Sequence, residues 1–272
     1  MKRKLDQAFV MENTSILVPI FESFRDQLDE HYDRRERIIK VSRDVTSYFC
    51  STTVRLNIRN FQPELIREGR VRTTNGEIPP KIACEIQEKK NTIQSYFESI
   101  VPDLLGMNTW RYFPQISPGL QEFVEAISLE NYIRHQSLIS LEDAKKMLPP
   151  GVMLIGDDYI LGILDLSGEL MRFAVTSMAT TGKLPGSQSS EGEGRDMLVD
   201  LRQLRTKFEE LDTTSCSGSW LGKEVERKLT VMRESVQKVE TAVCGLTIRG
   251  KERPAGRLLD STDERQFDGD RY

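Results

Sequence analysis

Apolar residues recur three or four positions apart through most of the chain. This is the spacing of amphipathic helices, and no segment alternates convincingly like a β-strand. The first such stretch, residues 15–60, contains no Gly or Pro after Pro19 and predicts one long helix. A break rich in Pro and Gly follows, and residues 81–105 predict a second helix. The apolar positions at helical spacing are Phe21, Phe24, Leu28, Ile38, Val41, Val45 and Phe49 in the first stretch, and Ile82, Ile86, Ile93, Phe97 and Ile100 in the second.

Two prolines interrupt the next helical pattern. Pro114 and Pro118 stand four positions apart, just before an apolar stretch that continues to about Gln136. Serine is a favoured N-cap residue, and proline is favoured at the first helical position. We therefore predict that a helix begins at Pro118 with Ser117 as its N-cap.

Capping residues and composition define the helices that follow. Ser140 and Asp143 have the spacing of a capping box and predict the start of a short helix. Residues 157–178 predict a longer helix that is apolar over most of its surface. Residues 180–195 are Gly, Ser and charged residues with almost nothing to bury, so we predict a mobile loop. Residues 197–211 return to a helical pattern.

The last helix, predicted over residues 223–248, carries a heptad seam. Its apolar residues alternate at steps of four and three: Val225, Leu229, Met232, Val236, Val239, Val243 and Leu246. Two interpretations are open, a seam that packs along a helix of another subunit and an ordinary core stripe of a bundle. In either case the chain is predicted to be all-α, with a single domain at 15–252, a flexible tail at 1–14 and a polar tail at 253–272.

The composition argues against several classes of protein. The 272 residues include 38 Lys plus Arg and 42 Asp plus Glu, and this net charge of −4 gives no overall attraction to nucleic acid. Only two histidines are present, and the four cysteines form no CxxC pair, so neither a zinc enzyme nor a disulfide framework is indicated. No apolar run is long enough to span a bilayer, and we expect no membrane partner and a location inside the cell.

Two pairs of acids lie within apolar helices. Asp165 and Glu169 are four residues apart in one predicted helix, and Glu122 and Glu125 are three apart in another, so each pair shares a helical face. Carboxylates that met in an apolar interior would repel one another and lose solvation, so a cation is expected among them. Oxygen ligands suit Mg²⁺, with Mn²⁺ as the alternative, and such a metal supports phosphoryl chemistry. The competing interpretation is a pair of ordinary surface features, with Glu169 bonded to Arg172.

A basic stripe lies on the first predicted helix. Arg37, Lys40 and Arg43 are three residues apart, and Arg34 extends the same stripe, which would suit the phosphates of RNA. A charge run on a long helix is also typical of a solvated face. Both interpretations are open, and DNA is a further candidate ligand.

Four sequence blocks resemble the translin superfamily in order and spacing. They are "ERIIKVSRD", "GLQEFVEAIS" followed by "RHQSLIS", "DYILGILDLSGELMR" and "VERKLTVMRESVQKVETAVCGLTIRG". The resemblance implies an elongated antiparallel bundle of about seven helices that assembles with a translin-like subunit into a hetero-oligomer. It also implies a Mg²⁺-dependent endoribonuclease, active in the complex, that cleaves small or single-stranded RNAs in RNA interference and tRNA processing.

The resemblance also assigns roles to the acids. The family's catalytic subunit takes its metal ligands from a Glu-x-x-Glu and an Asp-x-x-x-Glu helix, which correspond to Glu122, Glu125, Asp165 and Glu169. A departure from the family pattern is the pair of prolines, Pro114 and Pro118, which is expected to shorten one helix and to tilt Glu122.

Two other function classes compete with the nuclease. One is a non-catalytic adaptor that binds RNA and stabilises a translin-like partner. The other is a helical Mg²⁺ diphosphate enzyme, which ranks last because Asp157 and Asp158 have no third Asp at the spacing of a DDxxD motif. The stretch "KRKLD" at residues 2–6 resembles the start of a nuclear import signal, so both nucleus and cytoplasm are expected locations.

Overall fold

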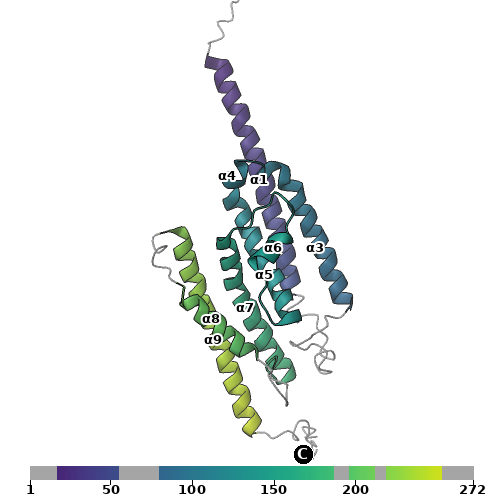
Figure 1. Cartoon of the computed structure of the whole chain (residues 1–272), viewed down its shortest axis with the longest axis vertical. Coiled ribbons are helices and arrows are strands. Elements are labelled where there is room, and N and C mark those ends of the chain that lie inside the picture. The colour runs from purple at the N-terminus through teal and green to yellow at the C-terminus, as the bar shows by residue number, and fades with distance from the viewer. Residues whose placement is uncertain (1–16, 55–79, 187–195, 212–218, 253–272) are drawn as a thin grey trace, which may run out of the picture.

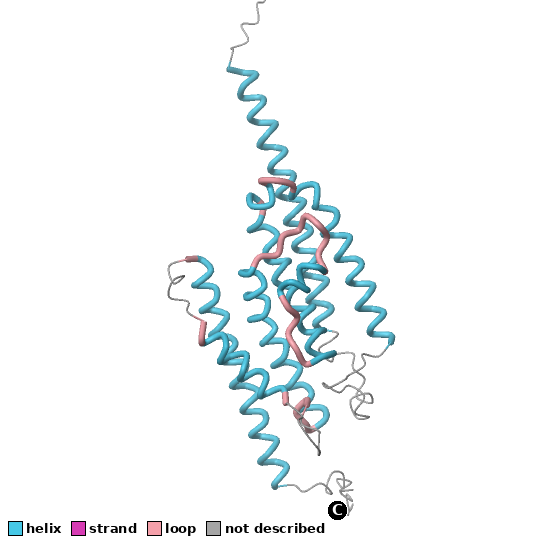
Figure 2. Tube along the Cα trace, viewed as in Figure 1, coloured by secondary structure: helices cyan, strands magenta, loops and turns pink. Residues whose placement is uncertain are grey.

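A computed structural model describes residues 17–54, 80–186, 196–211 and 219–252. Within these ranges every element of secondary structure is a helix, and loops connect the helices into an elongated bundle (Figures 1 and 2). The all-α prediction is therefore confirmed. In chain order the elements are α1 (Leu17–Val54), α3 (Pro80–Ile100), the 3₁₀ helix η2 (Val101–Leu104), α4 (Asn108–Arg111), α5 (Phe113–His135), α6 (Leu141–Lys146), α7 (Gly156–Thr181), α8 (Met197–Glu209) and α9 (Trp220–Glu252).

Helix α1 has two different halves. Its C-terminal half packs in the bundle, where Ile38 and Val45 are fully buried, while its N-terminal half projects beyond the other helices (Figure 1). The first apolar residues of the predicted stripe, including Phe21 and Leu28, lie exposed on this projecting part. The predicted extension of this helix over 55–60 lies outside the described residues.

The helix predicted over 81–105 is interrupted near its end. Helix α3 ends at Ile100, and Val101–Leu104 form a 3₁₀ turn with Pro102 in its first positions. Proline has no backbone N–H and disfavours the α conformation of the preceding residue, so the α-helical hydrogen-bond ladder stops there. A short helix that was not predicted, α4, then leads into α5.

The predicted start of α5 was wrong. The helix begins at Phe113, five residues before Pro118, and it accommodates Pro114 in its first turn and Pro118 in its interior. Ser117 is therefore a helical residue, and its hydroxyl donates a 2.6 Å hydrogen bond to Asp158 Oδ1 of α7 instead of capping α5. Ser117 and the neighbouring Ile116 are both buried. We attribute the longer helix to these tertiary contacts, which offset the hydrogen bond lost at Pro118.

Capping residues explain where α6 begins and where α7 ends. Ser140 is the N-cap of α6 and accepts a hydrogen bond from the backbone N–H of Asp143, as the capping-box spacing predicts. Helix α7 continues to Thr181 and ends at Gly182, whose φ of 68° is the left-handed conformation that glycine adopts readily. Most of the loop predicted over 180–195 lies outside the described residues.

Helix α5 is central and contacts α1 on one side and α7 on another, while α9 packs against α7 and α8. The heptad seam of α9 faces this interior. Val225, Leu229 and Met232 are buried, so the part of the seam that they form is a core stripe within the chain. The bundle interpretation of the seam is therefore confirmed, and the α8–α9 pair lies beside α7 (Figure 1).

A glycine allows α5 and α7 to approach closely. A Cβ on Gly162 of α7 would lie 2.8 Å from both the backbone oxygen of Gln121 and the Cβ of Val124 on α5. Real Cβ atoms essentially never come this close to such neighbours. Because Gly162 stands three residues before Asp165, and Val124 stands directly before Glu125, this contact brings the two acid-bearing helices together.

The described helices include none that is both long and apolar enough to cross a membrane. The predicted tails at 1–14 and 253–272, and with them the "KRKLD" stretch, lie outside the described residues.

Candidate functional site

The four predicted acids lie near one another on α5 and α7. Glu125 and Glu169 are buried, with 8% and 6% of their surface exposed, and Glu122 and Asp165 are half-buried. Each of Glu122, Asp165 and Glu169 shifts the pKa of Glu125 through its charge, so the four carboxyl groups are close enough to interact. The sequence prediction that both helices project acids into a partly apolar interior agrees with this placement.

Burial and mutual repulsion control the protonation of these acids. Burial, followed by the charges of Glu122, Glu169 and Asp165, raises the pKa of Glu125 to about 9. The pKa of Glu122 is raised by burial and then by the charge of Asp165. No hydrogen bond contributes to either shift. In the metal-free protein at neutral pH, Glu125 therefore carries a proton.

A lysine from a third helix enters the same site. Lys228 of α9 is buried, and its ammonium donates hydrogen bonds to Gln121 Oε1 at 3.1 Å, to the backbone oxygen of Leu161 at 3.4 Å and to Asp165 Oδ2. The pKa of Asp165 is raised by burial, and Lys228 opposes that shift through its charge and its hydrogen bond. The cation expected among the acids is thus, in part, a side chain of this chain.

Sequence reasoning missed Lys228, although a signal was present. Lys228 stands three residues after Val225 and four before Met232, so it shares the face of the heptad seam. A lysine on an apolar seam is rarely buried unless it is paired. That position could have been matched with the surplus of acids on α5 and α7.

The two acids of α7 are both bonded to cationic side chains. Glu169 is paired with Arg172 one turn later, as the surface interpretation predicted, while Asp165 is paired with Lys228. Within the described part of the chain, no group of three or more Asp, Glu, His or Cys side chains converges in a geometry that could hold a metal ion. Asp165 and Glu169 are thus each bonded to a different cation, Lys228 and Arg172.

A buried polar chain leads from the acids to the start of α5. Asp158 Oδ1 accepts hydrogen bonds from Ser117 at 2.6 Å and from Gln121 Nε2 at 3.4 Å. Because Gln121 also accepts from Lys228 through Oε1, its amide orientation is defined by contacts on both sides. Burial raises the pKa of Asp158 to about 6, although both hydrogen bonds oppose the shift. Residues of α5, α7 and α9 are tied together by this chain.

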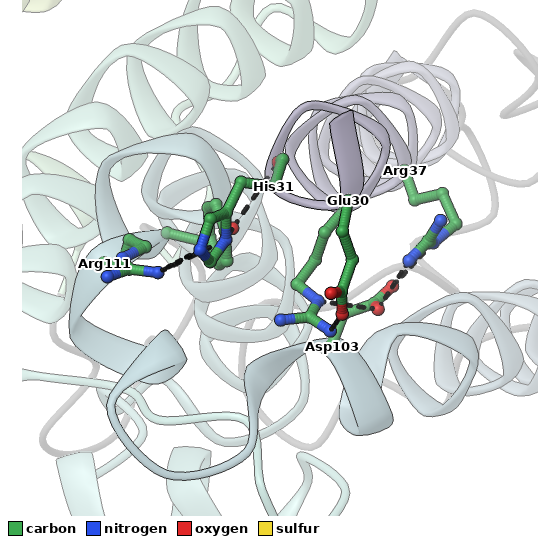
Figure 3. A network of polar contacts seen from close by, with 7 residues as sticks. Glu30, His31, Arg37, Asp103 and Arg111 are labelled. Carbon is green, nitrogen blue, oxygen red and sulfur yellow. Dashed lines mark hydrogen bonds and ion pairs between the residues drawn. The ribbon is translucent and has the colours of Figure 1, made fainter. Parts of the chain in front are cut away.

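The predicted basic stripe divides into two pairs. Arg37 donates to both carboxylate oxygens of Asp103, at 2.7 and 2.8 Å, and Arg34 donates to Asp103 at 3.3 Å (Figure 3). The hydrogen bond from Arg37 lowers the pKa of Asp103. These two arginines therefore fix α1 to η2. Arg34 is half-buried, and Arg37, Lys40 and Arg43 are exposed.

The same end of α1 is held by a second set of contacts. The His31 Nδ1 atom and the Tyr112 hydroxyl are 2.6 Å apart, and Arg111 Nη1 lies 2.7 Å from the other ring nitrogen (Figure 3). Arg111 Nη1 also lies 3.2 Å from Nδ1, and the Tyr112 hydroxyl donates to the backbone oxygen of His31 at 3.4 Å. This arrangement is structural and lies apart from the acids.

A groove of about 760 Å³ lies between the end of α5, α7 and α8 and is lined by Leu138, Val199 and Asp200, among others. Tyr132 and Gln136 donate to Asp200 Oδ2 at 2.7 and 2.8 Å. None of the four predicted acids lines this groove. It is therefore separate from the acid cluster.

Residues 33–250 match the Translin family. The chain belongs to the translin family. It is 28% identical to Translin-associated protein X of Rattus norvegicus, over 91% of this chain and 84% of that protein. It is 30% identical to the Translin-associated protein X homolog of Schizosaccharomyces pombe, over 81% of this chain and 84% of that protein. The crystal structure of apo-NeC3PO is similar in fold, with a TM-score of 0.54, 15% identity and coverage of 85% of this chain and 100% of that one.

The translin-family region contains every predicted site residue. Both acid pairs and the basic stripe from Arg34 to Arg43 lie within residues 33–250, and so does Lys228. The resemblance inferred from sequence blocks is therefore confirmed at the level of family and fold.

Proposed function

We propose that this translin-family chain is the catalytic subunit of a Mg²⁺-dependent endoribonuclease and works in a hetero-oligomer with a translin-like partner. The substrate class is small or single-stranded RNA. The observation that carries the proposal is that four carboxyl groups from α5 and α7 lie within range of one another's charge in a partly buried place. Such a cluster is unfavourable unless cations neutralise it.

The donor set fits a hard divalent cation. All four side chains offer carboxylate oxygens, which are the ligands that Mg²⁺ and Mn²⁺ prefer. Glu122 and Glu125 receive no hydrogen bond that stabilises their charged forms, so the local charge is only partly balanced by Lys228. At an effective dielectric of about 20, two unit charges about 4 Å apart interact by about 4 kcal/mol, and a divalent ion doubles that figure. The donor set therefore fits the ion in its chemistry, and the side chains would turn toward a common point to hold it.

Each acid has a distinct part in the proposed chemistry. Glu122 and Glu125 would hold the ion from α5, and Glu125 would give up its proton when it does so. Asp165 and Glu169 would hold it from α7. A divalent ion bound here would polarise a phosphate and lower the pKa of a bound water. Neither His31 nor His135 is among these residues, so no histidine general base is assigned.

Substrate binding is assigned to the exposed part of the basic stripe. Arg34 and Arg37 are bonded to Asp103, and Arg37, Lys40 and Arg43 are exposed on α1. We propose that Lys40 and Arg43 contact phosphates of RNA, because solvent can reach both and neither takes part in the pairing with Asp103.

The proposal is tested by removing one acid in the assembled complex. The full chain is reconstituted with its translin-like partner and incubated with labelled single-stranded RNA in Mg²⁺ or EDTA. Glu125→Gln should abolish cleavage while the complex still assembles, because the amide cannot become the anion that the ion requires. Glu130→Gln is the matched control, since Glu130 is also a buried acid of α5 but is paired with Lys90 and Arg134. Full cleavage by Glu125→Gln would overturn the proposed mechanism.

One observation favours a second function. Asp165 and Glu169 already have cationic partners, and no three acids converge in the described part of the chain. This arrangement suits a non-catalytic adaptor that stabilises a translin-like partner and retains RNA electrostatically. The same experiment separates the two functions, because an adaptor gives salt-sensitive RNA binding without turnover under any divalent ion.

A further inference from the structure

Among the described residues, Lys228 is the only buried lysine or arginine. Its ammonium has three N–H donors, and the structure supplies three acceptors, one each from Gln121, Leu161 and Asp165. Two of these acceptors are neutral, and Asp165 is the only carboxylate among the three. The pocket is therefore built for a single positive charge beside the acid cluster.

Lys228 and a metal ion would need the same carboxylate. The ammonium is bonded to Asp165, which is one of the four acids proposed to hold the ion. A lysine side chain is long and flexible, so the ammonium can move away without a change in the fold. Its departure would free Asp165 and leave the cluster with one more uncompensated negative charge.

We propose that Lys228 is a tethered cation that competes with a divalent ion for Asp165 and so regulates when the acid cluster becomes a metal site. This inference rests on the proposed function, and it makes Lys228 a positioning residue and not a ligand. In the metal-free protein Lys228 stabilises the cluster. When the ion binds, Asp165 exchanges the ammonium for the ion, and the Lys228 ammonium moves toward solvent.

The exchange has a consequence that a purely structural ion pair lacks. By linkage, two cations that compete for one carboxylate weaken each other's binding by the same factor. Removal of the ammonium should therefore destabilise the metal-free protein and strengthen metal binding at the same time. A lysine that only supported the fold would give weaker metal binding, or no change, when removed.

The test compares Lys228→Met with the wild-type full chain. Methionine is close in size to the lysine stem and carries no charge. We expect a lower unfolding midpoint without metal and a Kd for Mn²⁺ about tenfold lower than that of the wild type, measured by calorimetry. Lys90→Met is the matched control, because Lys90 also pairs with a buried glutamate of α5 but lies outside the acid cluster. It should lower stability and leave the Mn²⁺ Kd unchanged.

A second measurement needs no variant and covers the case in which Lys228→Met fails to fold. The wild-type chain is acetylated with N-hydroxysuccinimide acetate, and each lysine is followed by mass spectrometry. Saturating Mg²⁺ should raise the acetylation rate of Lys228 severalfold, with Lys90 as an internal reference.

The outcomes separate this inference from the proposed function. Wild-type binding of Mn²⁺ together with unchanged or weaker binding in Lys228→Met would overturn the role of Lys228 alone. An acetylation rate that does not respond to Mg²⁺ would do the same. If the wild-type chain binds no more Mn²⁺ than Glu125→Gln, the metal site is absent and both proposals are overturned.

Discussion

The buried Asp158 predicts a particular pH dependence of stability. It is 1% exposed, its Oδ1 atom accepts hydrogen bonds from Ser117 and Gln121, and its Oδ2 atom is buried without a partner. Burial raises its pKa from the usual 3.8 to about 6. The folded protein thus binds this proton more tightly than the unfolded chain, so the contribution of Asp158 to stability is full below about pH 4 and is lost as pH rises to about 6.

The size of this loss follows from the two pKa values. A shift from 3.8 to about 6 corresponds to about 3 kcal/mol between the protonated and ionised forms. In Asp158→Asn the side-chain oxygen still accepts from Ser117 and Gln121, and no ionisation occurs. The free energy of unfolding of the variant, relative to wild type, should therefore increase by about 2 kcal/mol between pH 4 and pH 7.5.

Urea denaturation followed by circular dichroism at several pH values measures this difference. Any fixed cost of the asparagine NH₂ group, which takes the place of the unpartnered oxygen, cancels when the two pH values are compared. Asp157→Asn is the matched control, because it removes the neighbouring acid, which is less buried, and should leave most of the pH dependence in place, since burial and not the charge of Asp157 is the main cause of the Asp158 shift. A stability difference between Asp158→Asn and wild type that stays constant from pH 4 to pH 7.5 would refute the reasoning.

Two further predictions concern the helix contact and the basic stripe. Gly162→Ala should destabilise the fold by about 1–3 kcal/mol in urea denaturation, because its Cβ would lie 2.8 Å from α5. Gly168→Ala, with nothing within 4 Å of its Cβ, should instead stabilise α7 by about 0.5–1 kcal/mol, and equal effects of the two changes would contradict the contact argument. Lys40→Ala with Arg43→Ala should make the slope of log K against log salt for binding of single-stranded RNA shallower by about 1.4 units, as measured by fluorescence anisotropy. A double alanine variant of the two exposed lysines of α6 should leave that slope unchanged, and an unchanged slope in both variants would remove the stripe from the RNA site.

The helical pattern predicted most of the fold because it is a local property. The spacing of apolar residues predicted the long helices, and the four residues from Ser140 to Asp143 were enough to recognise the N-cap of α6. The start of α5 was wrong because its local signals, Ser117 followed by Pro118, are overridden by contacts with α7. Tertiary contacts of this kind connect residues 41 positions apart and leave no periodic trace in the sequence.

In the candidate site, too, spacing within one helix could be predicted from the sequence, whereas contacts between helices could not. The acid pairs could be found because each lies on one helix at a fixed spacing, and their inward orientation followed from their apolar neighbours. Lys228 could not be placed beside Asp165 from spacing alone, since the two are 63 residues apart and belong to different helices. Likewise, only the structure separates Arg34 and Arg37, which bind Asp103, from the exposed Lys40 and Arg43.

The acid cluster works against the stability of the metal-free fold, and this is an argument for its function. Glu125 has a pKa of about 9, so its ionised form is strongly disfavoured where it lies. A buried charge pair such as Lys228 with Asp165 is often no more stabilising than apolar residues of the same volume. A chain that required only a stable bundle would gain by replacing these groups with apolar residues, which fill most of the buried positions of α5, α7 and α9. Groups with strongly perturbed pKa values that gather in one place are typical of functional sites, because their chemistry depends on the same charge that the fold disfavours. The cost of the cluster therefore supports a site in which cations are exchanged, with Lys228 present in one state and a divalent ion in the other.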